Sequence, residues 1–376
     1  MFVPGVTLAA SAAYTSAAAG RGPVYRRPGG DFDATATGDR AMKRHSMHTL
    51  AAAGALAGAM ALGGPAAAQT SWDLPLAWPD GNFHTENAKI FAERVEEETG
   101  GEVTINIHAG GALGFKGPEM ATAVRDGLVP IGDALLNNLM GDDPLFGLEA
   151  QPYLVEGFEE LAVLHEHFRP MLDELAEEYN QKVLYVVPWP RQYVYTKREV
   201  NEIGDLRGVK IRTYNPSTTE MFNRVGMTSV QLPWGEVVPA LAAGTIDAVT
   251  TSATSGVDGK FWEFLDYMYP TNHVWSSNMV SVNLDAWNAL SEENREIIQR
   301  LAEELEPEFW EVSRQEDVDM TEVLLENGIV MGDVSDEMTA EMQERTRPMI
   351  AEYIEDAGPR AEEVISAFLA DVGRSM

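Results

Sequence analysis

Cysteine is absent from the 376-residue sequence, and histidine is scarce, with 7 residues. The lack of cysteine excludes disulfides, thiolate metal sites, iron–sulfur clusters and a cysteine nucleophile. No His-Glu-x-x-His or Gly-x-Ser-x-Gly motif occurs. His165 and His167 are close in sequence, but on a helix they point in nearly opposite directions and are poor co-ligands. We therefore expect no metal, no other cofactor and no enzymatic activity.

Basic residues are also few, with 27 Lys and Arg against 59 Asp and Glu, which gives a formal net charge of -32. A nucleic-acid partner needs a basic surface, as does adhesion to anionic lipid. The charge therefore argues against both kinds of partner. Runs of glutamate such as 96–98 are typical of solvated helix faces.

Residues 42–68 have the three parts of a secretory signal peptide. Two basic residues near the start precede an apolar stretch over 50–62, and a small-residue cleavage signal ends at Ala68. A transmembrane anchor is the alternative, but the apolar stretch is too short and too rich in alanine for one. We predict export to the periplasm, cleavage after Ala68 and no direct membrane insertion.

Residues 1–41 stand upstream of this signal. They are rich in Ala, Gly and Arg and show no periodicity. We expect Met42 to be the true start, with 1–41 a non-native extension that takes no part in the fold.

Helical and strand patterns alternate along the rest of the chain, which predicts an α/β fold with mostly parallel sheets covered by helices. Past Ser291 the chain is almost entirely helix-forming and rich in Glu. No long Gly/Ser or Pro-rich linker occurs, so two domains would require the chain to cross between them more than once. Strands are predicted at 74–78, 103–107, 183–187, 192–196, 209–212 and 245–250, and helices at 85–98, 118–127, 157–179, 216–225 and 235–243.

Two arginines stand at predicted strand ends. Arg212 ends the strand at 209–212, just before Asn215, which is placed to cap the next helix, and Arg191 follows the strand at 183–187. Ligands bind beyond strand ends in open α/β sheets, and the guanidinium fork matches a carboxylate. The alternative is a surface arginine paired with a nearby acid.

Four tryptophans lie near predicted strand ends or loops: Trp78, Trp189, Trp234 and Trp275. Each one alone is more typical of core or hinge packing. Together they favour a cleft lined by aromatic rings.

The chain over 71–376 resembles the DctP-type solute-binding proteins of tripartite ATP-independent periplasmic (TRAP) transporters. The most specific motif is LPWGEVVPALAAGTID at 232–247. The other motifs that carry the resemblance are FAERV at 91–95, ETGG at 98–101, GALG at 111–114, QPY at 151–153 and DLRGVKIR at 205–212.

This resemblance implies two α/β domains joined by crossing strands and a long helix, with a ligand cleft between them that closes by a hinge. We predict domain I as 69–188 plus 278–316 and domain II as 189–277 plus 317–376. The implied partners are a small organic acid and the TRAP permease subunits, and the alternatives are an exported enzyme or a ligand-sensing subunit.

The resemblance also implies a binding site. Arg212 would form the principal salt bridge to the ligand carboxylate, and Arg191 would help to hold the carboxylate or the closed state. Trp234 would pack on the ligand, beside the polar Asn215. The remaining predicted binding residues are Trp78, Thr251 and Asn138.

One position departs from the family pattern. Many members carry Gln-Glu-Asn-Pro where this chain has Val-Thr-Thr-Ser at 249–252, so Thr251 stands near the position of a ligand-binding asparagine. A hydroxyl cannot replace the donor and acceptor of an amide. We therefore expect a monocarboxylate with a compact, partly apolar or aromatic body, such as a 2-oxo or 2-hydroxy acid, rather than a dicarboxylate or sialic acid.

Overall fold

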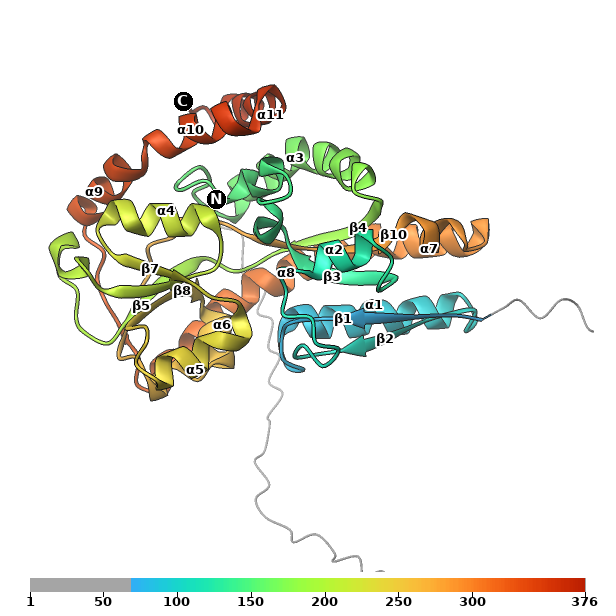
Figure 1. The fold of residues 1–376 in the computed structure, drawn as a ribbon, viewed down its shortest axis with the longest axis horizontal. Coiled ribbons are helices and arrows are strands. Elements are labelled where there is room, and N and C mark those ends of the chain that lie inside the picture. Colours follow the sequence, from blue (N-terminus) through green and yellow to red (C-terminus); the bar gives the residue numbers. More distant parts are fainter. Residues whose placement is uncertain (1–68, 376) are drawn as a thin grey trace, which may run out of the picture. The chain divides into compact units, whose positions relative to one another are not determined.

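The computed structural model describes residues 69–375, in which helices and strands alternate along most of the chain (Figure 1). The predictions for 1–41 and 42–68 lie outside the described residues. Within the described part, no helix is both long enough and apolar enough to cross a bilayer.

A parallel pair of strands begins the described chain. Strands β1 (Thr70–Pro75) and β2 (Val103–His108) pair in register and are joined by helix α1 (Phe83–Glu98). The helix buries one face, which includes Phe91 and Val95, as its apolar periodicity predicts. The loop before this helix carries the first residues of the site described below.

The second sheet has three antiparallel strands in the order β3-β10-β4. They are β3 (Ile131–Leu135), β10 (Ser277–Asn283) and β4 (Gln181–Pro188). Every residue of β3 and β10 is buried, so neither strand shows the alternation of polar and apolar residues that marks a half-exposed strand. Neither strand was predicted from the sequence.

The third sheet has six strands in the order β11-β9-β5-β8-β6-β7. Four of the eight strand pairings in the described chain are antiparallel, so the prediction of mostly parallel sheets is wrong. Parallel neighbours need a crossover within one sheet, whereas here β4 leads directly into β5 of the other sheet. The strands of the third sheet are β5 (Gln192–Thr196), β6 (Lys210–Thr213), β7 (Thr228–Gln231), β8 (Ala248–Ser252), β9 (Tyr267–Tyr269) and β11 (Val330–Met331).

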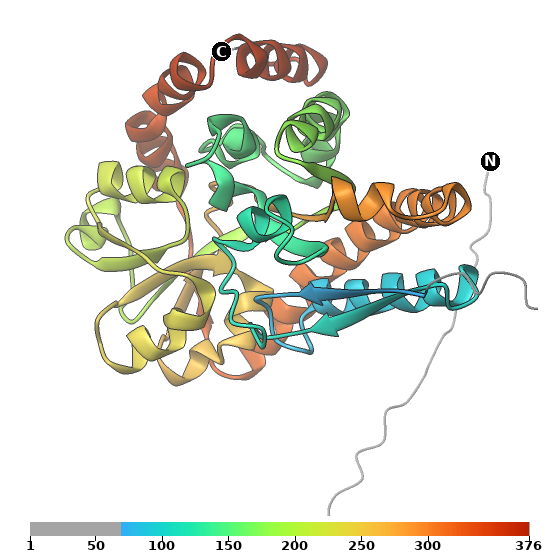
Figure 2. The same ribbon diagram turned by 45° about the vertical axis from the view of Figure 1, so that its right-hand side comes forward.

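Helices cover these sheets and form most of the C-terminal part (Figure 2). The remaining α-helices are α2 (Met120–Arg125), α3 (Phe158–Glu178), α4 (Pro216–Val225), α5 (Val237–Ala242), α6 (Ala253–Asp258), α7 (Leu284–Asn288), α8 (Glu292–Glu326), α9 (Asp336–Thr346), α10 (Pro348–Ala357) and α11 (Pro359–Asp371). Short 3-10 helices are η1 (Leu136–Leu139), η2 (Pro144–Ala150), η3 (Ile203–Leu206), η4 (Trp234–Glu236) and η5 (Phe261–Glu263).

The long helix α8 packs against α1 and β4 at one end and against α6 at the other. The fold is therefore two α/β domains that are joined by the strand connections β4–β5 and β9–β10 and by α8 (Figure 1). The residue boundaries of the two domains stay a prediction. Helix α9 packs on α4, whereas α11 packs on α3, so the C-terminal helices contact both domains.

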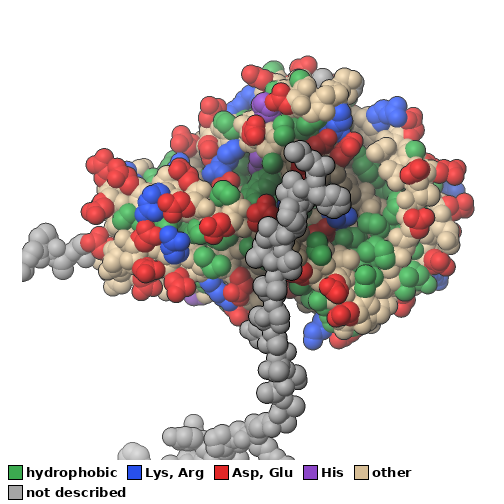
Figure 3. Space-filling view, turned by 180° about the vertical axis from the view of Figure 1, so that it is seen from behind, with side chains coloured by type: hydrophobic (Ala, Val, Ile, Leu, Met, Phe, Trp, Pro, Cys, Tyr) green, Lys and Arg blue, Asp and Glu red, His purple; other side chains and the backbone are tan. Residues whose placement is uncertain are grey.

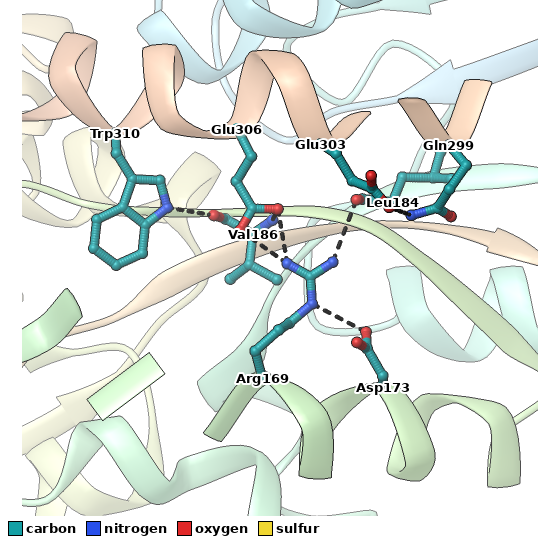
Figure 4. Close-up of polar contacts among 8 residues, drawn as sticks. All are labelled: Arg169, Asp173, Leu184, Val186, Gln299, Glu303, Glu306 and Trp310. Atoms are coloured by element: carbon teal, nitrogen blue, oxygen red, sulfur yellow. Dashed lines mark hydrogen bonds and ion pairs between the residues drawn. The ribbon is translucent and has the colours of Figure 1, made fainter. Parts of the chain in front are cut away.

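Side chains of α8 close the outer edge of β4 (Figure 4). Glu306 accepts a 3.2 Å hydrogen bond from the amide of Val186, and the indole of Trp310 donates to the carbonyl of the same residue at 2.8 Å. Arg169 of α3 lies 2.7 and 2.8 Å from the two carboxylate oxygens of Glu306 and donates to the carbonyl of Leu184 at 3.3 Å. These side chains supply the hydrogen bonds that a further strand would make.

The same helix then follows the chain from β4 into β5. Ser313 donates to the carbonyl of Pro188 at 2.6 Å, and Asp317 accepts from the hydroxyl of Tyr193 at 3.1 Å. The contacts recur about every turn of α8, so the helix is fixed to both sides of this domain crossing.

Acidic side chains are spread over the visible face, with Lys and Arg among them (Figure 3). Ion pairs one helical turn apart, such as Arg94–Glu98 and Arg300–Glu304, are partly exposed. Exposed pairs of this kind contribute little to stability, because water and salt screen their charges. The acidic charge is therefore mainly solvated rather than built into the core.

Candidate ligand-binding site

A cavity lies between the two domains, where strands of both sheets end. Its walls come from the segments that follow β1, β4 and β6, from the end of β3 and the residue before β10, and from β5, β6, β8, η4 and α6. The lining residues are Trp78, Leu135, Trp189, Gln192, Arg212, Tyr214, Trp234, Thr251, Ser255 and Ser276.

Arg212 enters this cavity from β6, and only 4% of the residue is exposed. Its Nε donates to the carbonyl of Leu232 at 3.1 Å, and its Nη1 donates to the carbonyl of Thr250 at 3.3 Å. Within residues 69–375, no carboxylate comes within ion-pairing distance of Arg212, and burial lowers the pKa of Arg212 to about 10. An uncompensated buried cation is costly, so the site is suited to an anion that enters from outside.

Tyr214 holds the other side of this guanidinium. Its ring centroid lies 5.3 Å from the central carbon of Arg212, and its hydroxyl is 3.2 Å from the hydroxyl of Ser276. Burial raises the pKa of Tyr214 to about 12, so the ring is neutral. A cation over a desolvated ring is stabilised by the π-electrons, which keeps the guanidinium in place without a negative partner.

The indoles of Trp78 and Trp189 form an aromatic wall. Their ring centroids are 4.7 Å apart in an edge-to-face arrangement, and the imidazole of His84 lies 4.5 Å from Trp189. Burial holds the pKa of His84 well below its usual value, so this imidazole is neutral. Trp234 contributes a third indole from η4, in the other domain.

Polar groups are few and neutral apart from Arg212. Thr251 on β8 and Ser255 on α6 offer hydroxyl groups, and Gln192 on β5 offers an amide. Gln192 on β5 pairs with Ser252 on the neighbouring strand β8, and Ser252 directly follows Thr251 in sequence. The amide that the family pattern places near Thr251 therefore has a possible substitute on the neighbouring strand.

The structure places four of the seven predicted site residues on the cavity: Arg212, Trp234, Trp78 and Thr251. Three others are not among its lining residues. Arg191 is about half exposed and pairs with Asp317 of α8 at 2.5 Å. Asn215 caps α4 by accepting from the amide of Thr218 at 2.8 Å, and Asn138 lies on η1.

Sequence reasoning proposed Trp189 for an aromatic cleft and did not find Gln192, Tyr214, Ser255, Ser276 or Leu135 in the wall. Tyr214 follows directly on the strand of Arg212, which is a usable signal. Leu135 ends β3 and Ser276 directly precedes β10, and neither strand was predicted from the sequence, so no signal pointed to these two residues. Trp275 lies in the core, where its indole donates to the carbonyl of Val155 at 3.2 Å.

The lining residues described here include no Asp, Glu, His or Lys, so no acid–base pair faces the cavity. In the part of the chain that the structure covers, no group of three His, Asp or Glu side chains is placed to hold a metal ion. The arrangement can bind an anion and enclose an apolar body beside it.

The chain is similar to known solute-binding proteins. The profile of the DctP family, described as bacterial extracellular solute-binding protein, family 7, matches residues 76–356. The ectoine-binding periplasmic protein TeaA of Halomonas elongata is 24% identical over 345 residues, which cover 88% of this chain and 97% of TeaA.

Two solved structures are similar in fold. DctP6 of Bordetella pertussis, an extracytoplasmic solute receptor binding pyroglutamic acid, has a TM-score of 0.78 and 29% identity, covering 80% of this chain and 100% of its own. A TRAP solute-binding protein from a marine metagenome, specific for pyroglutamate, has a TM-score of 0.77 and 31% identity, covering 80% of this chain and 99% of its own.

Proposed function

The chain belongs to the bacterial extracellular solute-binding proteins of family 7, the DctP family, and we propose that its ligand is a small acid with one carboxylate and a compact ring, such as pyroglutamate. Proteins of this family are periplasmic solute-binding components of TRAP transporters and not enzymes. In this role the chain captures an organic acid by closure of its two domains and delivers it to the membrane permease.

The observation that carries the ligand proposal is the isolation of Arg212. It is the one charged side chain among the described residues that line the cavity. A single guanidinium matches a single carboxylate, and the neutral aromatic wall on the other side favours an apolar or neutral ring. A second carboxylate on the ligand would have no cation to receive it in this lining.

Pyroglutamate is a five-membered lactam with one carboxylate, so it combines the two features. Its carboxylate would bind Arg212, its ring would lie against Trp78, Trp189 and Trp234, and its lactam group would meet the amide of Gln192 or the hydroxyl of Thr251. Two relatives that are 29% and 31% identical bind this acid, which supports the proposal.

A thermal-shift screen followed by calorimetric titration tests the proposal. Pyroglutamate should raise the melting temperature, because a ligand at 100 times its Kd adds about 2.7 kcal/mol to the free energy of unfolding. The matched controls are 2-pyrrolidone, which lacks the carboxylate, and glutarate, which carries a second one. Tight binding of succinate or sialate without any response to pyroglutamate or other ring acids would refute the proposed ligand class.

We also propose that the protein reaches the periplasm through cleavage of the signal at 42–68. The tripartite pattern of that segment supports this step. N-terminal sequencing of protein recovered from the periplasm should begin at Gln69 or within about two residues of it. Mature protein that retains residues 1–41 would refute both the cleavage site and the start at Met42.

A further inference from the structure

A buried carboxylate lies behind the aromatic wall of the cavity. Asp133, in the middle of β3, is 3% exposed. Its Oδ1 accepts a 2.8 Å hydrogen bond from the indole of Trp78 and a 2.6 Å hydrogen bond from the side-chain amide of Asn278 on β10. The carbonyl oxygen of that amide accepts a 2.8 Å hydrogen bond from the indole of Trp189. One carboxylate therefore holds Trp78 directly and Trp189 through a single intermediate.

Nothing in the described chain compensates the charge of Asp133. It forms no ion pair within residues 69–375, and its surroundings are neutral. Tyr185 is in register with it across β10 and is buried, and His84 beside the two indoles is neutral. Burial raises the pKa of Asp133 to about 7. A buried acid without a cation is a poor source of stability, so its presence calls for another explanation.

The geometry of the two indoles provides that explanation. An indole has one hydrogen-bond donor, its ring N–H group. A hydrogen bond from this group to a fixed acceptor therefore holds the ring in one orientation. Both donors of the aromatic wall are used in this way, and the rings meet edge to face at 4.7 Å. Without these bonds, each ring would keep its apolar contacts but could turn about its side-chain torsions.

The charge has a second effect. Arg212 enters the cavity from the six-stranded sheet, whereas Trp78 and the carboxylate behind it belong to the other domain. The cavity therefore has a positive group on one side, and it has a negative potential behind the opposite wall whenever Asp133 is ionised, which its raised pKa allows above about pH 7. A ligand with its anionic end at Arg212 and a neutral body at the indoles fits this field, and a ligand anionic at both ends does not.

We propose that Asp133 is the positioning residue of the binding site, which orients the indoles of Trp78 and Trp189 and selects against ligands with a second carboxylate. This inference rests on the proposed binding of a monocarboxylate. Asp133 acts through the two indoles, and it is not among the residues that line the cavity.

Two substitutions separate the hydrogen bonds from the charge. Asp133→Asn keeps an oxygen that can accept from Trp78 and Asn278, but it removes the charge. Asp133→Leu removes both and keeps the branched shape of the side chain, with two larger methyl groups in place of the oxygens. The matched control is Ser281→Ala, because Ser281 is also buried on the same sheet but bonds to Gln181 and does not line the cavity.

The first measurement needs no ligand. Near-ultraviolet circular dichroism reports the environment of the tryptophans, while far-ultraviolet spectra and melting curves check the fold. Asp133→Leu should lose much of the tryptophan signal at a temperature where it is fully folded, and Asp133→Asn and Ser281→Ala should keep it. A wild-type tryptophan signal in folded Asp133→Leu overturns the positioning role.

The second measurement is calorimetric titration with pyroglutamate and glutarate. Asp133→Leu should bind pyroglutamate at least about tenfold more weakly, and Asp133→Asn should restore binding to within about threefold of wild type, with Ser281→Ala unchanged. Asp133→Asn should also gain at least about tenfold in the affinity for glutarate relative to pyroglutamate.

Equal loss of pyroglutamate binding in both Asp133 variants, or unchanged selectivity in Asp133→Asn, overturns the proposal. Wild-type protein that does not bind pyroglutamate refutes the proposed function instead, and the spectra still decide whether Asp133 orients the indoles.

Discussion

The side-chain amide of Asn82 donates a 2.7 Å hydrogen bond to Oδ2 of Asp258, 176 positions later in the chain. Asn82 precedes α1 and caps it by accepting from the amide of His84, and Asp258 ends α6. The bond thus joins elements of the two predicted domains close to the cavity, because Trp78 and Ser255 stand a few residues away in sequence from its two ends. Burial raises the pKa of Asp258 to about 6.

Asn82→Asp should weaken ligand binding by about tenfold or more. The change replaces the amide that donates to Asp258 by a second carboxylate, and the lost hydrogen bond to a charged group contributes about 1.5–3 kcal/mol. Aspartate still caps α1, so the helix is retained. The loss should be larger at pH 8 than at pH 5, since one of two adjacent acids is protonated at low pH. Calorimetric titration at both pH values measures it.

Asn82→Ser is the control for this change, because serine keeps the cap and adds no charge. It should lose less affinity than Asn82→Asp and show little dependence on pH. Wild-type affinity in Asn82→Asp at pH 8 would show that the contact with Asp258 does not help to close the cavity.

Arg212→Met should weaken binding of the acid by roughly 30- to 5,000-fold, because removal of one partner of a buried charged pair costs about 2–5 kcal/mol. Arg212→Lys should fall between this variant and wild type, since it keeps the charge but loses the planar fork. The melting temperature of the ligand-free Met variant should not fall, because the arginine has no carboxylate partner in the described chain. Affinity within about threefold of wild type for Arg212→Met would exclude Arg212 as the main anchor.

Arg191→Ala should cost much less affinity than Arg212→Met. Arg191 is about half exposed, pairs with the buried Asp317 and does not line the cavity, so its removal should affect the ligand only indirectly. The expected loss is therefore up to about fivefold. Asp317→Asn removes the other partner and should have a similar effect if the pair supports the closed form; a loss seen only in Arg191→Ala would indicate direct contact with the ligand.

The stability of Asp133→Asn relative to wild type should depend on pH. Burial raises the pKa of Asp133 to about 7, against about 3.9 for an unperturbed aspartate. The folded state therefore binds this proton more tightly than the unfolded chain, and the free energy of unfolding of wild type falls between about pH 4 and pH 7. The asparagine variant lacks this decline, so its stability relative to wild type should rise over that interval and then level off.

Urea denaturation at several pH values measures this difference. Asp126→Asn is a control of opposite sign, because the hydrogen bond from Arg125 lowers the pKa of Asp126 below its ordinary value. That variant should become relatively less stable as the pH rises. A difference between Asp133→Asn and wild type that does not change with pH would contradict the raised pKa.

Glu306→Ala should lower the free energy of unfolding by about 3 kcal/mol, because it leaves Arg169 partly buried without its main partner and the amide of Val186 without an acceptor. Glu303→Ala is the matched control one turn away on α8. Glu303 is exposed and accepts from Gln299, so its loss should stay within about 0.5 kcal/mol. Chemical denaturation distinguishes the two, and equal effects would exclude the role of Glu306 in closing the edge of β4.

Much of the fold could be predicted because residues next to each other in sequence mark where several helices and strands begin and end. Strand β5 and helix α4 have the bounds predicted for them, since Asn215, Pro216 and Gly226 mark the ends of the helix. Strands β3 and β10 were missed because they are buried on both faces and carry polar residues such as Asn278 and Ser281. Their hydrogen bonds become visible only once distant segments are brought together.

The site was predictable where a functional residue follows a recognisable strand, as Arg212 does. Arg191 also follows a strand, but its direction is set by Asp317, 126 positions away on α8. Asp133 had no local signal at all. Its importance depends on the indoles of Trp78 and Trp189, which the chain brings to it from 55 and 56 positions to either side.

The closure of the β4 edge also has a consequence for the order of events during biosynthesis. A ribosome completes Val186 120 residues before Glu306, the residue that occupies its amide. Until α8 has been made, β4 has an unoccupied row of peptide groups, which is a template for pairing with other chains. The N-terminal half of this protein therefore cannot finish folding ahead of the rest, and a nascent or translocating chain needs protection from aggregation until residue 313 has emerged.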